Sequence, residues 1–161
     1  MIELGSLKCL VLTVPFHTLD SLFFVVSCDG DATCAVFTGD SVFSMGCGRF
    51  FEGDALMCDA AFQTFRSLPP SALVFFGHEY SDANATFALT VDPNNEALQE
   101  AAAAVKALRL EGKCTAPSTI GRELAINPFL RCDTAEIRRA VGGDTAVETL
   151  RLLRERKNTF R

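Results

Sequence analysis

The sequence has 161 residues, of which 48% are hydrophobic and 22% charged, which excludes a disordered chain and predicts one ordinary domain, or one domain with an appendage. Fifteen Lys and Arg against twenty Asp and Glu give a formal net charge of −5, so no nucleic-acid partner is expected. The apolar runs are far shorter than the ~20 residues of a membrane span, so no membrane partner is expected either.

The seven cysteines contain no Cys-x-x-Cys pair, and an odd number cannot all form disulfides within one chain. We therefore expect reduced thiols and a cytoplasmic protein. Residues 10–14 resemble the apolar core of a secretion signal, but Glu3 precedes them, the run is short and no small-residue cleavage site follows. A buried strand is the better interpretation of this segment.

Short strands are predicted in the first half of the chain. Turn residues separate runs rich in Val, Phe and Thr at 7–14, 21–27, 34–38 and 73–76. Residues 28–31 predict a hairpin turn, because Gly30 tolerates the positive φ that tight turns need. One helix interrupts the strands, beginning near Asp54 and ending before Pro69.

From residue 79 onward the pattern is helical. Residues 96–110 predict an Ala-rich helix that Asn95 caps at its start and Gly112 closes at its end. Two further helices are predicted after Asp133 and Thr145, because each is followed three residues later by a glutamate, the spacing of a capping box.

The change of pattern near residue 79 predicts two regions. Residues 1–78 form a β-rich domain and residues 79–161 a helical domain, which together give an α+β fold.

Three polar residues follow apolar runs at the ends of predicted strands, namely His17, Asp40 and His78. Sheet proteins gather ligands beyond such strand ends, so we expect these three side chains to converge. Two imidazoles and a carboxylate suit a divalent ion such as zinc. The alternative is a pair of partly buried histidines that bind neighbouring carbonyls, with Asp40 capping a turn.

Arg154 and Lys157 lie three residues apart in a predicted helix and therefore share one face, where they could bind a common carboxylate. Taken alone, residues 151–157 are better interpreted as an ordinary solvated basic run. We expect Arg154 to be exposed, so that its replacement leaves stability nearly unchanged.

The order of several motifs along the chain resembles the hydroxyacylglutathione hydrolase, or glyoxalase II, family of the metallo-β-lactamase superfamily. The motifs occupy residues 37–53, 76–80, 91–95, 116–119, 127–131 and 154–160. The resemblance covers essentially the whole chain. It implies the C-terminal half of an αββα sandwich followed by a small helical domain, and hydrolysis of S-D-lactoylglutathione to D-lactate and glutathione.

Carried over position by position, the resemblance makes His17 a ligand of one metal, Asp40 the carboxylate that bridges two metals, and His78 a ligand of the second. The implied metal is zinc, with iron or manganese as alternatives. Such ions bring the pKa of bound water towards about 7, which provides a hydroxide to attack the thioester carbonyl.

The resemblance also implies substrate contacts. Arg49, Tyr80, Arg154 and Lys157 match residues that bind the glutathione thioester, the last two as a clamp for the glycine carboxylate. Phe51 stands where the family usually has a tyrosine, so it can pack against the tripeptide but cannot donate a phenolic hydrogen bond.

The family's Thr-His-x-His-x-Asp-His motif belongs upstream of the region that residue 1 matches. We therefore expect an N-terminally truncated form with an incomplete metal centre. This leaves two functions: an impaired thioester hydrolase, or a non-catalytic module that binds glutathione or dimerises. Half of the sandwich would also be missing, so we expect an exposed sheet edge, an apolar face and self-association.

Overall fold

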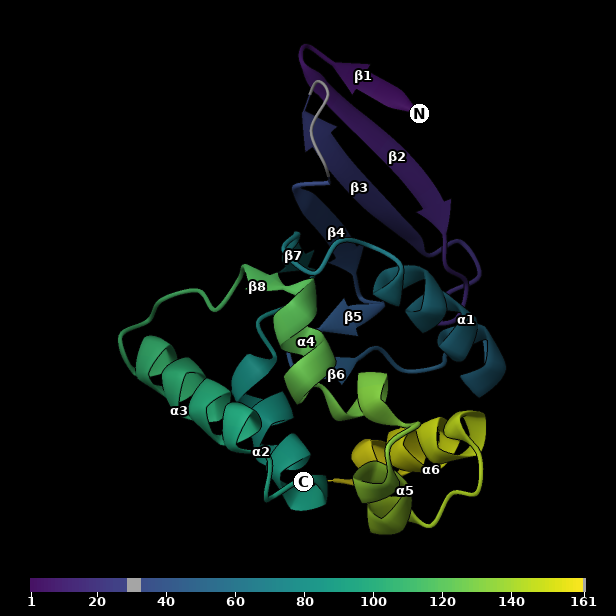
Figure 1. Ribbon diagram of the computed structural model, residues 1–161, viewed down its shortest axis with the longest axis vertical. Helices are drawn as coiled ribbons and strands as arrows, with labels where there is room; N and C mark the ends of the chain where they lie inside the picture. The colour runs from purple at the N-terminus through teal and green to yellow at the C-terminus, as the bar shows by residue number, and fades with distance from the viewer. Residues whose placement is uncertain (29–32, 161) are drawn as a thin grey trace.

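The computed structural model describes residues 1–28 and 33–160, and it combines one large sheet with helices gathered at one end of it (Figure 1). The strand order in the sheet is β1-β2-β3-β4-β7-β8. The strands are β1 Ile2–Leu4, β2 Leu7–Thr13, β3 Leu22–Cys28, β4 Ala35–Gly39, β7 Leu73–Phe76 and β8 Ser118–Thr119. The β4–β7 pair is parallel, and the other neighbouring strands are antiparallel.

The four predicted strands are confirmed as β2, β3, β4 and β7. β3 and β4 pair antiparallel with Phe24 opposite Phe37, as a hairpin requires. Of the predicted turn at 28–31, the first residue ends β3, and residues 29–31 lie outside the described residues.

Helix α1, Ala55–Arg66, covers one face of the sheet. It begins where predicted, because the Asp54 carboxylate accepts a hydrogen bond from the Met57 backbone N–H at 2.9 Å. Its buried side includes Phe62 and Phe65, whose rings meet Phe16 and Phe23 edge to face across the core.

The opposite face of the sheet is apolar and uncovered within the described chain. Phe24 and Phe37 are 39% and 45% exposed, and Phe37 stacks on Phe75 with ring centroids 5.0 Å apart. The expected exposed edge and apolar face are therefore confirmed. The expectation that residues 10–14 form a buried strand is confirmed only in part. Val14 is 1% exposed and Leu12 packs against the core, whereas Leu10 is 43% exposed because much of β2 extends beyond α1 (Figure 1).

Helices dominate the second half of the chain. They are α2 Ser81–Val91, α3 Glu96–Leu110, α4 Ile120–Ile126, the 3₁₀ helix η1 Pro128–Arg131, α5 Ala135–Val141 and α6 Ala146–Thr159. The predicted caps of α3 are confirmed: the Asn95 side chain accepts a bond from the Leu98 N–H, and Gly112 has a φ of +71° just beyond the helix.

The two predicted capping boxes differ from the observed caps. Thr134, not Asp133, caps α5, because the helix begins one residue later than predicted. Thr145 caps α6 as predicted, but the Glu148 carboxylate accepts its bond from the Asp144 N–H at 3.1 Å instead of the Thr145 N–H.

A two-stranded hairpin lies between the sheet and the helices (Figure 1). It consists of β5, Val42–Phe43, and β6, Gly46–Cys47. The main apolar cluster runs from the sheet through α1 into the helical region, where Phe129, Leu150 and Leu153 join it. In the described part of the chain, no helix is both long and apolar enough to cross a bilayer.

Candidate functional site

His17, Asp40 and His78 come together as predicted. The Asp40 Oδ2 atom lies 3.5 Å from His17 Nε2 and 3.2 Å from His78 Nε2. Asp40 follows β4 and His78 follows its parallel neighbour β7, so two of the three side chains meet because parallel strands end at the same edge.

The backbone around this cluster leaves room for few side chains. A Cβ atom at Gly48 would collide with the Asp40 carbonyl and the His17 ring, and one at Gly77 would collide with the Asp40 carboxylate. The Arg49 carbonyl accepts a hydrogen bond from His17 Nδ1 at 2.9 Å, which leaves His17 Nε2 directed at Asp40.

The donor chemistry of this cluster suits zinc, but the residues do not complete a metal centre. Across residues 1–28 and 33–160, no group of three or more His, Cys, Asp or Glu side chains has an arrangement that could hold a metal ion. In the two-metal arrangement that the resemblance implies, each ion would have one imidazole and a share of the Asp40 carboxylate, fewer protein donors than the three of a catalytic zinc site.

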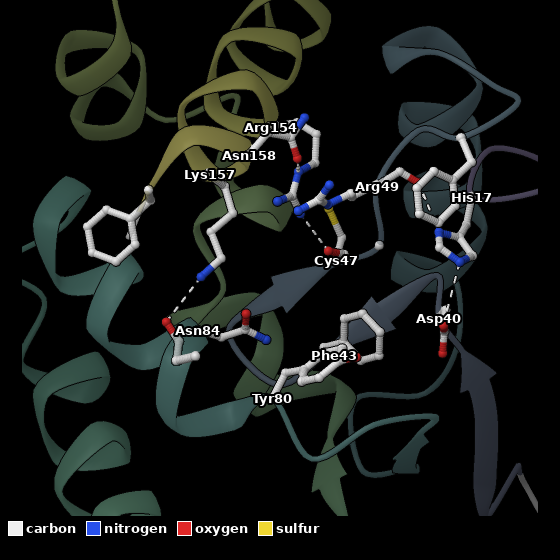
Figure 2. Close-up of a pocket in the computed structure, with 14 residues that line it drawn as sticks. His17, Asp40, Phe43, Cys47, Arg49, Tyr80, Asn84, Arg154, Lys157 and Asn158 are labelled. Atoms are coloured by element: carbon white, nitrogen blue, oxygen red, sulfur yellow. Dashed lines mark hydrogen bonds and ion pairs between the residues drawn. The ribbon is translucent and has the colours of Figure 1, made fainter.

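A cavity of about 350 Å³ extends from His17 and Asp40 to helix α6 (Figure 2). All five predicted substrate residues line it: Arg49, Phe51, Tyr80, Arg154 and Lys157. The structure therefore brings the histidine and carboxylate donors and the basic residues to one pocket.

Arg154 is buried, so the expectation of an exposed charge is wrong. It is 6% exposed, and its Nη1 donates a hydrogen bond to the Cys47 carbonyl at 2.7 Å. Its Nε donates to Asn158 Oδ1, and its guanidinium lies over the Phe129 ring. The sequence could not reveal this burial, because the Cys47 carbonyl on β6 meets Arg154 only in the folded chain.

Lys157 is half-buried at the same end of the pocket. Its Nζ donates to the Ala83 carbonyl at 3.1 Å and lies 4.9 Å from the centre of the Phe87 ring. Burial, with the positive charge of Arg154, lowers the pKa of Lys157 to about 8, although Cys47 opposes this shift.

Cys47 is a buried residue of the pocket wall. Burial alone would raise the pKa of its thiol, but a hydrogen bond from Cys58 and the positive charges of Arg154 and Lys157 lower it below the ordinary value. Six cysteines are free thiols, as predicted: Cys9, Cys34, Cys47, Cys58, Cys114 and Cys132.

Aromatic rings surround the polar groups. Phe51 lies 4.9 Å from the His17 ring, and Tyr80 stacks on His78 at the same centroid separation. Phe43, on β5, meets Tyr80 edge to face. The sequence did not single out Phe43, because one more phenylalanine among fourteen gives no signal of a site.

Comparison with known proteins identifies the relatives of the chain. The family described as "Hydroxyacylglutathione hydrolase C-terminus" matches residues 79–160. The chain belongs to the hydroxyacylglutathione hydrolase family. It is 44% identical to the hydroxyacylglutathione hydrolase of Methylococcus capsulatus and 42% identical to that of Rhodospirillum rubrum, each over 161 residues. Each match covers 99% of this chain and 61% of the relative, so the chain spans about three-fifths of their length.

Solved structures show the fold of this family member. A metallo-β-lactamase from Staphylococcus aureus covers 89% of the chain and 36% of its own length, with a TM-score of 0.59 and 19% identity. ETHE1 from Myxococcus xanthus covers 99% of the chain and 50% of its own length, with a TM-score of 0.60 and 23% identity. The predicted metallo-β-lactamase-type α+β fold is therefore confirmed.

The burial of Arg154 predicts a stability effect. Arg154→Ala should lower the free energy of unfolding by about 1.5–3 kcal/mol, because it leaves the buried Cys47 carbonyl without its charged donor. Arg151→Ala, on the exposed side of the same helix, removes only an ion pair with Glu155 and should cost less than about 1 kcal/mol. Urea denaturation of both variants measures the difference; equal losses would contradict the role given to Arg154.

Proposed function

We propose that this chain binds S-D-lactoylglutathione and serves its hydrolysis to D-lactate and glutathione. The observation that carries the proposal is the single pocket in which the His17–Asp40 cluster and the basic residues of α6 face one another. Membership of the hydroxyacylglutathione hydrolase family supports the same substrate. A cytoplasmic location is proposed with it, on the free cysteines of the described chain.

The basic residues have separate tasks in this proposal. Arg154 and Lys157 bind the glycine carboxylate; their hydrogen bonds to the Cys47 and Ala83 carbonyls use neutral acceptors and leave both positive charges for the ligand. Arg49 extends towards Arg154 from the His17 side of the pocket (Figure 2). Tyr80 and Phe51 contact the peptide portion, so the thioester end is directed towards the His17–Asp40 cluster.

The proposal for metal binding is more limited than the proposal for substrate binding. His17, Asp40 and His78 would hold zinc, or iron or manganese, only together with further donors, because these three residues do not complete a centre. We therefore propose that turnover by the chain alone is impaired.

Binding should respond to the protonation of Lys157. We expect the affinity for S-methylglutathione to fall by roughly fivefold as the pH rises from 7 through the Lys157 pKa of about 8 and beyond, since a neutral amine loses about 1 kcal/mol of ionic contact. Calorimetric titration at pH 7 and 9.5 measures this loss.

Lys157→Arg is the matched control for that titration, because a guanidinium stays charged throughout this pH range. The alkaline loss should be smaller in this variant than in the wild type. Equal losses in both proteins would assign the pH dependence to the ligand, and absence of binding at pH 7 would refute the proposed function.

The incomplete donor set predicts weak metal retention. After dialysis with zinc, the chain should hold less than one ion per molecule and hydrolyse S-D-lactoylglutathione negligibly. Elemental analysis and loss of thioester absorbance measure the two properties. Stoichiometric zinc with robust turnover would overturn this prediction, and Asp40→Asn should then abolish both.

A second candidate function is a non-catalytic module that binds glutathione or dimerises. The observation that favours it is the exposed edge strand β1, which pairs only with β2 among the described residues. We propose that a second copy of the chain pairs with this edge, because antiparallel pairing of β1 with itself continues the sheet about a two-fold axis.

This self-association can be tested by light scattering after size exclusion. Wild type should behave as a dimer at micromolar to millimolar concentration, and Leu4→Lys should shift it towards monomer, because a charged edge residue opposes strand pairing. Leu110→Lys, at an exposed position of α3, is the control and should leave the dimer unchanged. A monomeric wild type would refute the edge contact.

A further inference from the structure

Glu123 is a fully buried carboxylate in α4, outside the pocket described above. Its Oε2 accepts a hydrogen bond from the Met45 backbone N–H at 2.9 Å, and its Oε1 accepts one from Ser118 Oγ at 2.6 Å. Burial raises the pKa of Glu123, although these bonds and one from Asn127 oppose the shift. Burying a carboxylate costs free energy unless hydrogen bonds or a counter-charge compensate for the lost water. The groups that Glu123 contacts therefore indicate its role.

Glu123 contacts the turn of the β5–β6 hairpin. Met45, at the centre of that turn, is a non-glycine residue with a φ of +55°, a conformation that costs free energy and needs support. Asn127 supplies further support, because its Nδ2 donates to the Phe43 and Gly46 carbonyls, each at 3.0 Å. Side chains beyond the hairpin therefore bind successive backbone groups of this turn.

The other side of the turn is held from α2. Asn84 Nδ2 donates to the Ser44 carbonyl at 3.1 Å, and a side chain at Gly46 would collide with the Asn84 amide. The turn thus lies between α2 and α4. Its position cannot shift without breaking hydrogen bonds on one side or the other.

The segment that leaves this turn, β6 and the two residues after it, reaches both ends of the pocket. The carbonyl of Cys47 receives the Arg154 guanidinium, and two residues later the carbonyl of Arg49 receives His17 Nδ1 (Figure 2). A displacement of the turn would move these two carbonyl acceptors, and with them the cation and the imidazole.

We propose that Glu123 is a positioning residue of the pocket: through the Met45 turn it sets the place of the Cys47 carbonyl and so of the Arg154 guanidinium. The effect on ligand affinity rests on the proposed function, whereas the effect on Arg154 does not.

Two substitutions of Glu123 distinguish the effect of its hydrogen bonds from the effect of its charge. Glu123→Gln keeps an oxygen for the Met45 N–H, and its amide can donate to Ser118 Oγ, because a hydroxyl also accepts. Glu123→Ala leaves the Met45 N–H and the Ser118 hydroxyl without this partner. The glutamine variant should therefore bind like wild type and the alanine variant should not.

A double-mutant cycle with S-methylglutathione as the probe tests the proposal. Arg154→Ala should weaken binding by roughly 10- to 150-fold, and Glu123→Ala by about fivefold or more. In the Arg154→Ala background, Glu123→Ala should add less than about twofold, since both act on the same contact. Additive effects would overturn the proposal, as would wild-type affinity in Glu123→Ala.

A second measurement does not depend on the ligand. The NMR signal of Arg154 Nε–H should be sharp in wild type and Glu123→Gln, and broadened or shifted in Glu123→Ala. Val25→Ala, a core change on β3, controls for loss of stability and should leave the signal in place. If wild type binds no probe, the proposed function fails while this signal still decides the role of Glu123; an unchanged signal in Glu123→Ala refutes that role.

Discussion

The hydrogen bond from Arg154 to the Cys47 carbonyl joins parts of the chain that are 107 residues apart, and the pocket depends on it. The bond holds α6 against the β5–β6 hairpin, and the segment that follows β6 carries the Arg49 carbonyl that orients His17. One guanidinium thus fixes the relative position of the basic end of the pocket and its histidine end. The Arg154 side chain is buried and so contributes to the stability of the fold. It also lines the cavity.

The cluster of His17, Asp40 and His78 could be predicted from the sequence because its position follows from a simple rule. Asp40 and His78 end adjacent parallel strands, and the β-rich runs that mark those strands are local features. The surroundings of Arg154 could not be predicted in this way. A basic residue in a charged helical segment reads as solvated, and its burial is decided by an acceptor on a distant two-residue strand.

The short elements that position the pocket, α4 and the β5–β6 hairpin, were even harder to predict from the sequence. Helix α4 has seven residues and β5 and β6 have two each, which is too short for a hydrophobic period to show. Glu123 reads as an ordinary charged helical residue, although it is fully buried. The capping of α5 by Thr134 instead of Asp133 has a similar origin, since neighbouring polar residues both suit an N-cap and only packing chooses between them.

Lys157 lies between two aromatic rings, 4.9 Å from the centre of Phe87 and 5.6 Å from that of Phe160. Its ammonium has already given up part of its hydration and much of its rotational freedom before any ligand arrives. An incoming carboxylate restores charge neutralisation to a group that is oriented to receive it, whereas a carboxamide of the same shape would only exchange one neutral contact for another. In the proposed function, the pocket would therefore select ligands by the charge of their terminus.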